Sequence, residues 1–444
     1  MTATDPGPAD GIAATGPGAA PVGGAGPGPI GGPHPDIGDV GAHRAAMAET
    51  IDRARRTVPF YADHHRGIAS VELGDQPSCT KAHLGGYGPF PLSAVPLSAM
   101  HHVSATSGTT GARLFVGYTR SDWDDVRTQY GHAVAALGLN PDDVLLNTHG
   151  GGLWIGHPSL QELAHAAGAG TVPVGPTNPD QVLAWLRELP VTLLSATPSF
   201  MRVLVERAGA DGIDLRTVPL RMALLGGEGA GVEVRRQVAS AFGPRFRWQE
   251  LYGSTETAGP ILAFGDSEDR LSGCLEVNTA YFVAEILALH ADEPVEPGEL
   301  GELTLSTPFR QGSPLIRYRT RDLAARIPGR WGARSGFPAM TSLLGRVDDA
   351  IKVRGALLYP RVIEEACVAH LAPGAEWRIV LSREAGSHDV LTLQVEADDP
   401  AARDPLTRQV HDATGVRPVV EAVPPGSLER FPGKARRVVD HRTG

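Results

Sequence analysis

Short apolar runs, separated by polar, glycine- and proline-rich turns, follow one another through the middle of the chain. Runs of strand length alternate there with longer segments of helical spacing, the first of which opens on Pro198, a residue suited to the first turn of a helix. This alternation predicts an α/β fold, a parallel sheet with crossover helices. We expect strands at 191–195, 221–225 and 246–250, and helices at 198–208 and 232–242.

Helical composition also marks two segments nearer the start of the chain. Residues 41–57 are expected to form a helix that Val58-Pro59 breaks, because proline is excluded from helix interiors. A second helix is expected at 123–137. Ser121 would cap it, with Asp124 three positions on as a weaker form of the capping box.

The C-terminal part of the chain is predicted to form a separate unit. Residues 282–289 and 302–306 look like strands of a more antiparallel region before it. From Gly345 onward, the order strand, helix, strand, strand, helix, strand predicts a small α+β domain of roughly 100 residues, a usual size for an independent lobe. These elements are expected at 350–353, 361–370, 377–382, 390–396, 400–414 and 417–423.

The N-terminal segment is dominated by glycine, proline and alanine, with no lysine or arginine before Arg44. Such a segment buries too little apolar surface to offset its ordering entropy, and it lacks the basic start and apolar stretch of a secretory signal. We therefore expect a disordered tail at 1–40, a large domain at 41–344 and a small domain at 345–444.

Bulk composition narrows the class of protein. A chain of 444 residues suits two or more domains, and no run approaches the ~20 apolar residues that span a bilayer. The net charge of −10 argues against a nucleic-acid partner. Three scattered cysteines fit a reducing cytoplasm and offer no cysteine metal site. We expect a cytoplasmic protein with small-molecule ligands.

Candidate chemistry begins with the run Ser107-Gly108-Thr109-Thr110-Gly111. Glycines let the backbone approach a ligand closely, and hydroxyl and N–H donors suit phosphate oxygens, although such a run is more often a plain turn. Lysine occurs only at positions 81, 352 and 434, which makes each one informative. Further segments follow in order: Tyr252-Gly253-Ser254-Thr255-Glu256, Tyr318-Arg319-Thr320-Arg321-Asp322, Gly345-Arg346-Val347-Asp348-Asp349 and Gly433-Lys434.

In this order the segments resemble those of the adenylate-forming ligases, and within them the phenylacetate–CoA ligase branch. Val58-Pro59-Phe60-Tyr61, Thr197-Pro198-Ser199 and residues 314–322 support the same resemblance, which extends from residue 41 to the C-terminus. It implies a large adenylate-forming domain with mixed sheets and a small, mobile C-terminal domain. The implied reaction joins a carboxylate to the α-phosphate of ATP with Mg²⁺ and passes the acyl group to coenzyme A (CoA).

The resemblance also implies which residues hold the nucleotide. Ser107, Gly108, Thr109, Thr110 and Gly111 would hold the β- and γ-phosphates. Thr255 would contact the α-phosphate, and Tyr252 would cover the adenine, whose other side Gly227 and Glu228 would line. Gly253 would also belong to the nucleotide site. A carboxylate can accept hydrogen bonds from vicinal hydroxyls, so Asp322 fits the ribose, with Arg346 as a second contact.

Three further residues complete the expected catalytic machinery. Glu256 is the candidate Mg²⁺ ligand, because this ion is typically held by one or two carboxylates plus substrate phosphates. Lys434 is implied to enter the site only during adenylation, and Asp348 matches the family's hinge. Plainer interpretations stay open: a core Tyr252, a solvated Glu256, Asp322 paired with Arg319 or Arg321, Arg346 paired with Asp348 or Asp349, a turn residue at Asp348 and a solvated Lys434.

By the same resemblance the acyl pocket combines a glycine run with flat apolar walls, which suit an aromatic acid. His149 and His157 are eight residues apart and form no obvious metal pair, and His101-His102 lacks a convincing partner. Structural histidines are the better interpretation. The expected pocket residues are His149, Gly151, Gly152, Trp154, Pro198 and Phe200.

One departure from the family pattern keeps alternatives open. Relatives usually carry a lysine just after the phosphate run, whereas Ala112-Arg113 follows here, and arginine does not replace lysine geometrically. The activated group could instead pass to an amine or a carrier protein, or the enzyme could activate nitrite to diazotise an aromatic amine. A non-catalytic nucleotide-binding protein is a further alternative. Relatives often form dimers, but nothing in the sequence identifies an interface.

Overall fold

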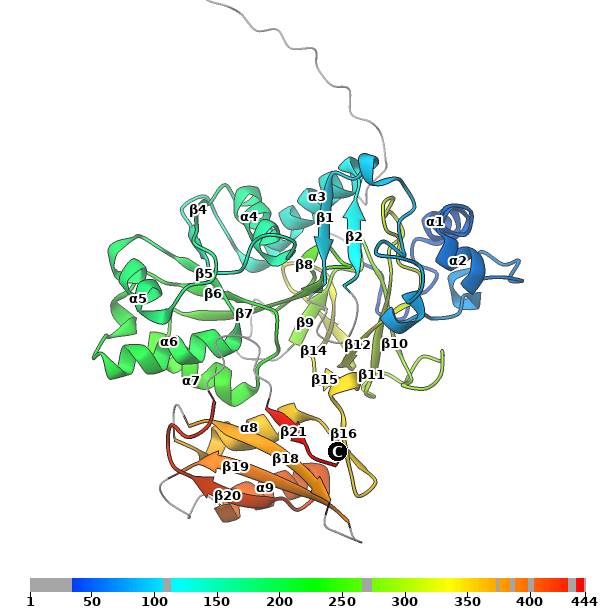
Figure 1. Ribbon diagram of the computed structural model, residues 1–444. Coiled ribbons are helices and arrows are strands. Elements are labelled where there is room, and N and C mark those ends of the chain that lie inside the picture. The colour runs from blue at the N-terminus through cyan, green and yellow to red at the C-terminus, as the bar shows by residue number, and fades with distance from the viewer. Residues whose placement is uncertain are drawn as a thin grey trace, which may run out of the picture.

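The computed structural model describes residues 34–106, 113–265, 274–372, 375–383, 388–397, 403–429 and 437–442. Its elements form a large unit and a small one, and Figure 1 shows the small unit, in orange and red, below helices α6 and α7 of the large unit. No described helix has both the length and the apolar character needed to cross a membrane.

A nine-stranded sheet organises the large unit. Its strand order is β13-β14-β9-β8-β7-β6-β5-β3-β4; β4, β3, β5, β6 and β7 are parallel, whereas the remaining neighbours pair antiparallel. The predicted parallel sheet with crossover helices is therefore confirmed. The strands are β3 (Val144–Asn147), β4 (Gly170–Pro173), β5 (Leu193–Ala196), β6 (Met222–Leu225), β7 (Arg247–Ser254), β8 (Gly259–Gly265), β9 (Cys274–Val277), β13 (Arg326–Trp331) and β14 (Pro338–Thr341).

Helices cover both faces of this sheet. Alternate residues of the buried strands belong to different cores, because successive side chains of a strand point to opposite faces. Leu145 and Leu193 pack in the core that contains α3 and α4, whereas Leu146 and Leu194 pack with α5, α6 and α7. The helices are α3 (Arg120–Leu137), α4 (Gly156–Ala166), α5 (Pro179–Glu188), α6 (Pro198–Ala210) and α7 (Val232–Phe242).

Within the described part of the chain, two smaller sheets and the α-helices α1 and α2 also belong to the large unit. One sheet has the order β10-β11-β12-β15 and is antiparallel, as predicted for this region, and the hairpin β1–β2 forms the other. The helix break at Val58 is confirmed, and a second short helix begins at Pro59. The elements are α1 (Arg44–Thr57), α2 (Pro59–His64), β1 (His102–Ala105), β2 (Phe115–Tyr118), β10 (Val283–Leu287), β11 (Gly301–Ser306), β12 (Tyr318–Ala324) and β15 (Gly345–Arg346).

The small unit has its own core beneath a four-stranded sheet of order β20-β19-β18-β21. The predicted order of strands and helices is found, with β17 and β21 as additional strands. Its elements are β16 (Ile351–Val353), β17 (Ala356–Leu358), α8 (Pro360–His370), β18 (Trp377–Arg383), β19 (Asp389–Glu396), α9 (Arg403–Thr414), β20 (Val419–Val423) and β21 (Val438–Asp440).

Three local predictions differ from the structure. Thr119, rather than Ser121, caps α3, in a capping box with Asp122. Part of the expected tail is ordered: Ile37 is buried, and the amide of Gly38 donates to the carbonyl of Ala284 at 2.8 Å. Strand β7 runs on to Ser254 because β8 pairs with its last residues.

Candidate functional site

The expected phosphate run Ser107, Gly108, Thr109, Thr110 and Gly111 lies outside the described residues, as does Lys434. The strands on either side of that run are paired: Thr106 donates its amide to Leu114 at 3.0 Å, next to the pair Ala105 and Phe115. The Nζ of Lys81 donates to Oγ1 of Thr106 at 3.0 Å. The sequence did not identify Lys81 as part of this neighbourhood, because the contact joins segments 25 residues apart.

The turn between β7 and β8 presents Thr255 and Glu256. The hydroxyl of Tyr118 fixes this turn: it donates to the carbonyl of Thr255 and accepts from the amide of Ala258 at 2.9 Å. Ala258 has a positive φ of 68°, an uncommon conformation for a residue with a side chain. Because Tyr118 belongs to β2, the turn is tied directly to the strand that follows the phosphate run.

Glu256 is buried, with 7% of its surface exposed, so its interpretation as a solvated charge is wrong. The Tyr318 hydroxyl donates to Oε1 of Glu256 at 3.0 Å. Burial, together with the Glu256 carboxylate, raises the pKa of Tyr318 well above its usual value, which keeps this donor protonated. Arg310 approaches from the other side, donating to the Glu256 carbonyl at 3.4 Å and lying 4.7 Å from the centre of the Tyr118 ring.

The carboxylate of Glu256 fits the chemistry of a magnesium ligand. It is an oxygen donor with acceptor capacity beyond the bond from Tyr318. Within the described ranges, no group of three or more His, Cys, Asp or Glu side chains could hold a metal ion. A single carboxylate agrees with an ion that substrate phosphates help to bind, not with an all-protein cage.

Asp322 is the centre of a second group of polar side chains. The Tyr252 hydroxyl donates to Oδ2 of Asp322 at 2.7 Å, and Nη1 of Arg346 donates to Oδ1 at 2.7 Å. The alternative partners of Asp322 are engaged elsewhere: Arg319 pairs with Glu302, and Arg321 pairs with Glu302 and Asp348. The structure thus brings together three of the residues predicted to contact adenine and ribose, Tyr252, Asp322 and Arg346. Tyr252 is also a core residue, 8% exposed.

The predicted second wall of the adenine site adjoins the predicted acyl pocket. Oε1 of Glu228 accepts a 2.7 Å hydrogen bond from the amide of Ser199, in the first turn of α6. Gly227 has a φ of +86°, and a Cβ there would lie 3.7 Å from Thr197. Both contacts lie at the carboxyl ends of β5 and β6, where a parallel sheet binds ligands.

Gly253 has a structural requirement that the sequence did not reveal. A Cβ at this position would lie 1.9 Å from the carbonyl oxygen of Gly259, which pairs with Ser254 across β7 and β8. Close packing of these two strands therefore demands glycine, independently of any nucleotide.

Two of the predicted acyl-pocket residues contact each other, and two more border open space. The rings of His149 and Trp154 meet edge to face with centroids 4.9 Å apart, and a Cβ on Gly151 or Gly152 would find no heavy atom within 4 Å. Burial, with a smaller effect of His157, lowers the pKa of His149 to about 4. The imidazole is therefore neutral near pH 7 and supplies no positive charge to a carboxylate.

The remaining histidine predictions agree with structural roles. His157 Nδ1 lies 2.8 Å from the carbonyl oxygen of His149, so one nitrogen of the His157 ring contacts the backbone. His102 stacks on Trp123 with ring centroids 4.2 Å apart. Asp348, the predicted hinge, lies in a 3₁₀ turn directly after β15 and pairs with Arg321 at 3.0 Å.

Two family models match this chain: AMP-binding enzyme over residues 80–310, and AMP-binding enzyme C-terminal domain over residues 355–442. A phenylacetate-coenzyme A ligase from Thermus thermophilus is 30% identical over 427 residues, covering 90% of this chain and 94% of that protein. The ligase of the same name from Escherichia coli is 29% identical, covering 88% and 92%.

Solved structures of a 2-hydroxyisobutyryl-CoA ligase share the fold. Its postadenylation state in complex with 2-HIB-AMP matches with a TM-score of 0.79 at 23% identity, over 92% of this chain and 91% of that one. The same ligase in its thioesterification state, with 2-HIB-AMP and CoA, matches with a TM-score of 0.63 at 25% identity, over 91% and 90%. The chain as a whole therefore matches the former structure with the higher TM-score.

Proposed function

The chain belongs to the AMP-binding enzyme family, and from this we propose that it activates a carboxylic acid with ATP and transfers the acyl group to CoA. In the first step a carboxylate oxygen attacks the α-phosphorus, the bond to the bridging oxygen breaks, and pyrophosphate leaves. In the second step the CoA thiolate attacks the acyl carbon and AMP leaves. The observation that carries the proposal is the Tyr252–Asp322–Arg346 group beside the turn of Thr255 and Glu256.

The described residues would bind and orient the nucleotide, and none of them is proposed to form a covalent bond with the substrate. Asp322, held from two sides, would accept the ribose hydroxyls, and the ring of Tyr252 would cover the adenine. Glu256 would hold Mg²⁺, which neutralises phosphate charge when bound. Thr255, whose backbone Tyr118 fixes, would contact the α-phosphate. Preorganised groups of this kind act by positioning and electrostatic stabilisation.

We propose an aromatic acid as the substrate. The relatives named phenylacetate-coenzyme A ligase support this class, and so do the flat Trp154 ring and the open space at Gly151 and Gly152. A neutral His149 beside the pocket agrees with binding of the apolar end of the acid there, with the carboxylate directed toward the nucleotide.

The decisive experiment measures acid-dependent AMP formation with ATP and Mg²⁺ over a panel of aryl acids and nitrite, each with and without CoA. AMP together with a thioester, formed with an aryl acid when CoA is present, is the expected result. AMP released with nitrite and an aromatic amine but without thioester would replace CoA transfer by diazotisation. Trp154→Ala should raise the KM for the acid about 10-fold through lost ring contact, whereas Trp331→Ala, a half-exposed ring on β13, is the matched control.

A further inference from the structure

One glutamate of the small unit is shared between an arginine from each unit. Oε1 of Glu376 accepts from Nη2 of Arg202 on α6 at 2.6 Å, and Oε2 accepts from Nη2 of Arg437 at 2.9 Å. The side chains of Arg202, Glu376 and Arg437 are 11%, 7% and 10% exposed. We call this group the Glu376 bridge. It links the large and small units through charges that are almost fully removed from water.

Each charge of the bridge also has a partner within its own unit. Arg202 lies 3.7 Å from Glu206, one turn further along α6, and Glu376 keeps Arg437, which also pairs with Glu364 at 3.2 Å. Removing a buried ion-pair partner is costly when the remaining charge stays buried and unpaired. Here separation of the units exposes the charges to water and leaves both sides paired. The bridge is therefore suited to repeated opening.

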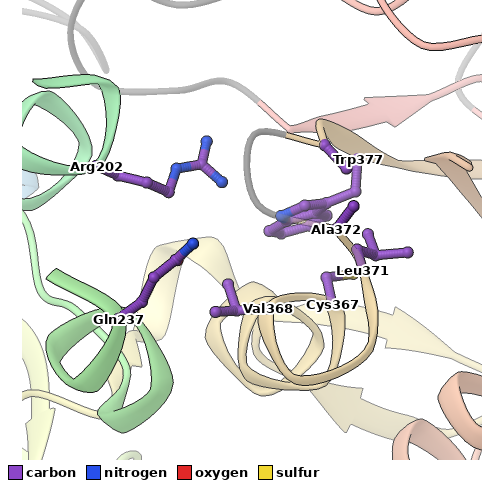
Figure 2. A pocket seen from close by; sticks show the side chains of 8 residues that line it. Arg202, Gln237, Cys367, Val368, Leu371, Ala372 and Trp377 are labelled. Carbon is purple, nitrogen blue, oxygen red and sulfur yellow. The ribbon is translucent and has the colours of Figure 1, made fainter. Parts of the chain in front are cut away.

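The surroundings of the bridge are incompletely filled. Figure 2 shows a cavity with Arg202 and Gln237 of the large unit facing Val368, Leu371 and Trp377 of the small unit. Within the described residues, the indole Nε1 of Trp377 is buried without a hydrogen-bond partner. Other contacts also join the units near here: Nη2 of Arg361 donates to the carbonyl of Ala230 at 2.6 Å, and Val368 packs against the core of the large unit. Arg202–Glu376 is the ion pair of this group that crosses between the units.

Arg437 connects the bridge to the expected chemistry. It follows Lys434 by three residues and stacks over the Trp377 ring with its guanidinium carbon 4.6 Å from the ring centre. The bridge thus holds Arg437 itself, at a position three residues after Lys434 in the sequence. The chain as a whole also matches the postadenylation state of the 2-hydroxyisobutyryl-CoA ligase with a higher TM-score than its thioesterification state.

We propose that Arg202 and Glu376 form a latch that holds the small unit in the adenylating arrangement and opens before transfer to CoA. Both are positioning residues: they act by keeping the small unit docked against α6 of the large unit. This inference rests on the proposed function. It predicts different effects on the two half-reactions. The contact between Arg202 and Glu376 exists only in the docked arrangement, so its loss should impair only the half-reaction that uses this arrangement.

The test compares the two half-reactions in Arg202→Met, in Arg202→Lys and in a matched control. The control is Arg207→Met, on the same helix, where Arg207 pairs with Asp180 at 2.6 Å and with Asp211 at 3.1 Å inside the large unit. For Arg202→Met we expect acid-dependent ATP–pyrophosphate exchange to fall about 10-fold, as removal of one stabilising ion pair implies. CoA-dependent consumption of supplied acyl-adenylate should stay within about twofold of the wild type.

Arg202→Lys should recover part of the exchange activity, and Arg207→Met should change neither half-reaction. Equal losses in both half-reactions of Arg202→Met would identify a general structural role and overturn the latch. Full exchange activity in that variant would overturn it as well. Glu376→Gln is the second variant, and its exchange should fall in the same way with thiolysis retained.

A distance measurement tests the latch without relying on activity. The three native cysteines are buried, so nitroxide labels can be directed to Glu188→Cys on α5 and Asp412→Cys on α9, both exposed positions. The docked distance should dominate in otherwise unmodified protein and lose population in Arg202→Met. An unchanged distribution would overturn the latch. Absence of exchange with every acid in the wild type would instead count against the proposed function.

Discussion

The Tyr252 hydroxyl donates a 2.7 Å hydrogen bond to Oδ2 of Asp322, so the residue expected over the adenine also orients the carboxylate expected at the ribose. Arg346 holds the other oxygen at 2.7 Å. Burial, with the nearby Asp322 carboxylate next, raises the pKa of Tyr252 well above its usual value, so the donor persists at any pH the protein tolerates. The predicted contacts with adenine and with ribose are thus linked through the hydrogen bond between Tyr252 and Asp322.

Replacing Tyr252 by phenylalanine should weaken ATP binding while leaving an aromatic ring for the adenine. A hydrogen bond to a charged group contributes about 1.5–3 kcal/mol, so we expect the KM for ATP to rise roughly 10-fold with a smaller change in kcat. Steady-state AMP formation at varied ATP measures both. Tyr87→Phe is the control, because Tyr87 bonds Asp63 at 3.1 Å on the surface. An unchanged KM in Tyr252→Phe would show that the bond does not orient Asp322 for nucleotide.

Glu256→Gln should abolish most of the magnesium-dependent activity. The amide keeps the size of the side chain and can still accept from Tyr318, but it loses the charge that the ion requires. We expect AMP formation to fall about 100-fold or more, against about 10-fold in Tyr318→Phe, which removes only the supporting bond. Titration with Mg²⁺ separates the variants. Equal Mg²⁺ dependence in Glu256→Gln and wild type would exclude Glu256 as a ligand.

Gly253→Ala should destabilise the protein irrespective of nucleotide. The new Cβ would lie 1.9 Å from the Gly259 carbonyl oxygen, which is backbone and cannot rotate away. Overpacking of this kind costs about 3 kcal/mol or more. Gly131→Ala is the control with the opposite expected effect. Gly131 lies within α3, and a Cβ there would meet nothing within 4 Å. The free energy of unfolding should therefore rise by about 0.5–1 kcal/mol. Urea unfolding without ligand measures both, and a Gly253→Ala protein as stable as wild type would refute the steric argument.

His149→Phe should reduce the acid sensitivity of folding. The pKa of His149 is lowered from 6.5 to about 4, so the folded protein disfavours the charged form. Above pH 6.5 this histidine does not lower the free energy of unfolding. As the pH falls from 6.5 toward 4, it lowers the free energy of unfolding by up to ~3 kcal/mol for a shift of this size. The phenylalanine variant should lack this part of the pH dependence. His165→Phe, an exposed position on α4, should retain it, and parallel pH profiles of wild type and His149→Phe would contradict the prediction.

The bounds of several helices and strands could be predicted from local sequence patterns alone. Helix α7 spans Val232–Phe242 as predicted, because Gly231 and Gly243 bound an apolar pattern of helical spacing. The start of α3 was less determinate, since Thr119–Asp122 and Ser121–Asp124 both have the spacing of a capping box. The structure uses the first pair because Asp122 is buried and also accepts from the amides of Gln311 and Gly312. A contact with a distant segment decided between two equal local patterns.

The same limit applies to the candidate site. Tyr252, Asp322 and Arg346 were predicted as a nucleotide group from ordered motifs, and they lie together. The supporting contacts were not predictable, because Tyr318 reaches Glu256 over 62 residues and Tyr118 reaches Thr255 over 137. No sequence pattern near either tyrosine indicates which residue its hydroxyl will contact. The motifs name the residues that would touch a ligand, whereas the fold determines what holds them.

Strand β15 has a consequence for how an intermediate would be kept. Its residues Gly345 and Arg346 pair with Leu323 and Asp322 of β12, so the arginine at the ribose position belongs to the sheet of the large unit, two residues before Asp348. A rotation of the small unit about Asp348 would leave the pairing of Arg346 with β12 unchanged. The adenylate would then stay bound at one position on the large unit while the small unit changes its orientation.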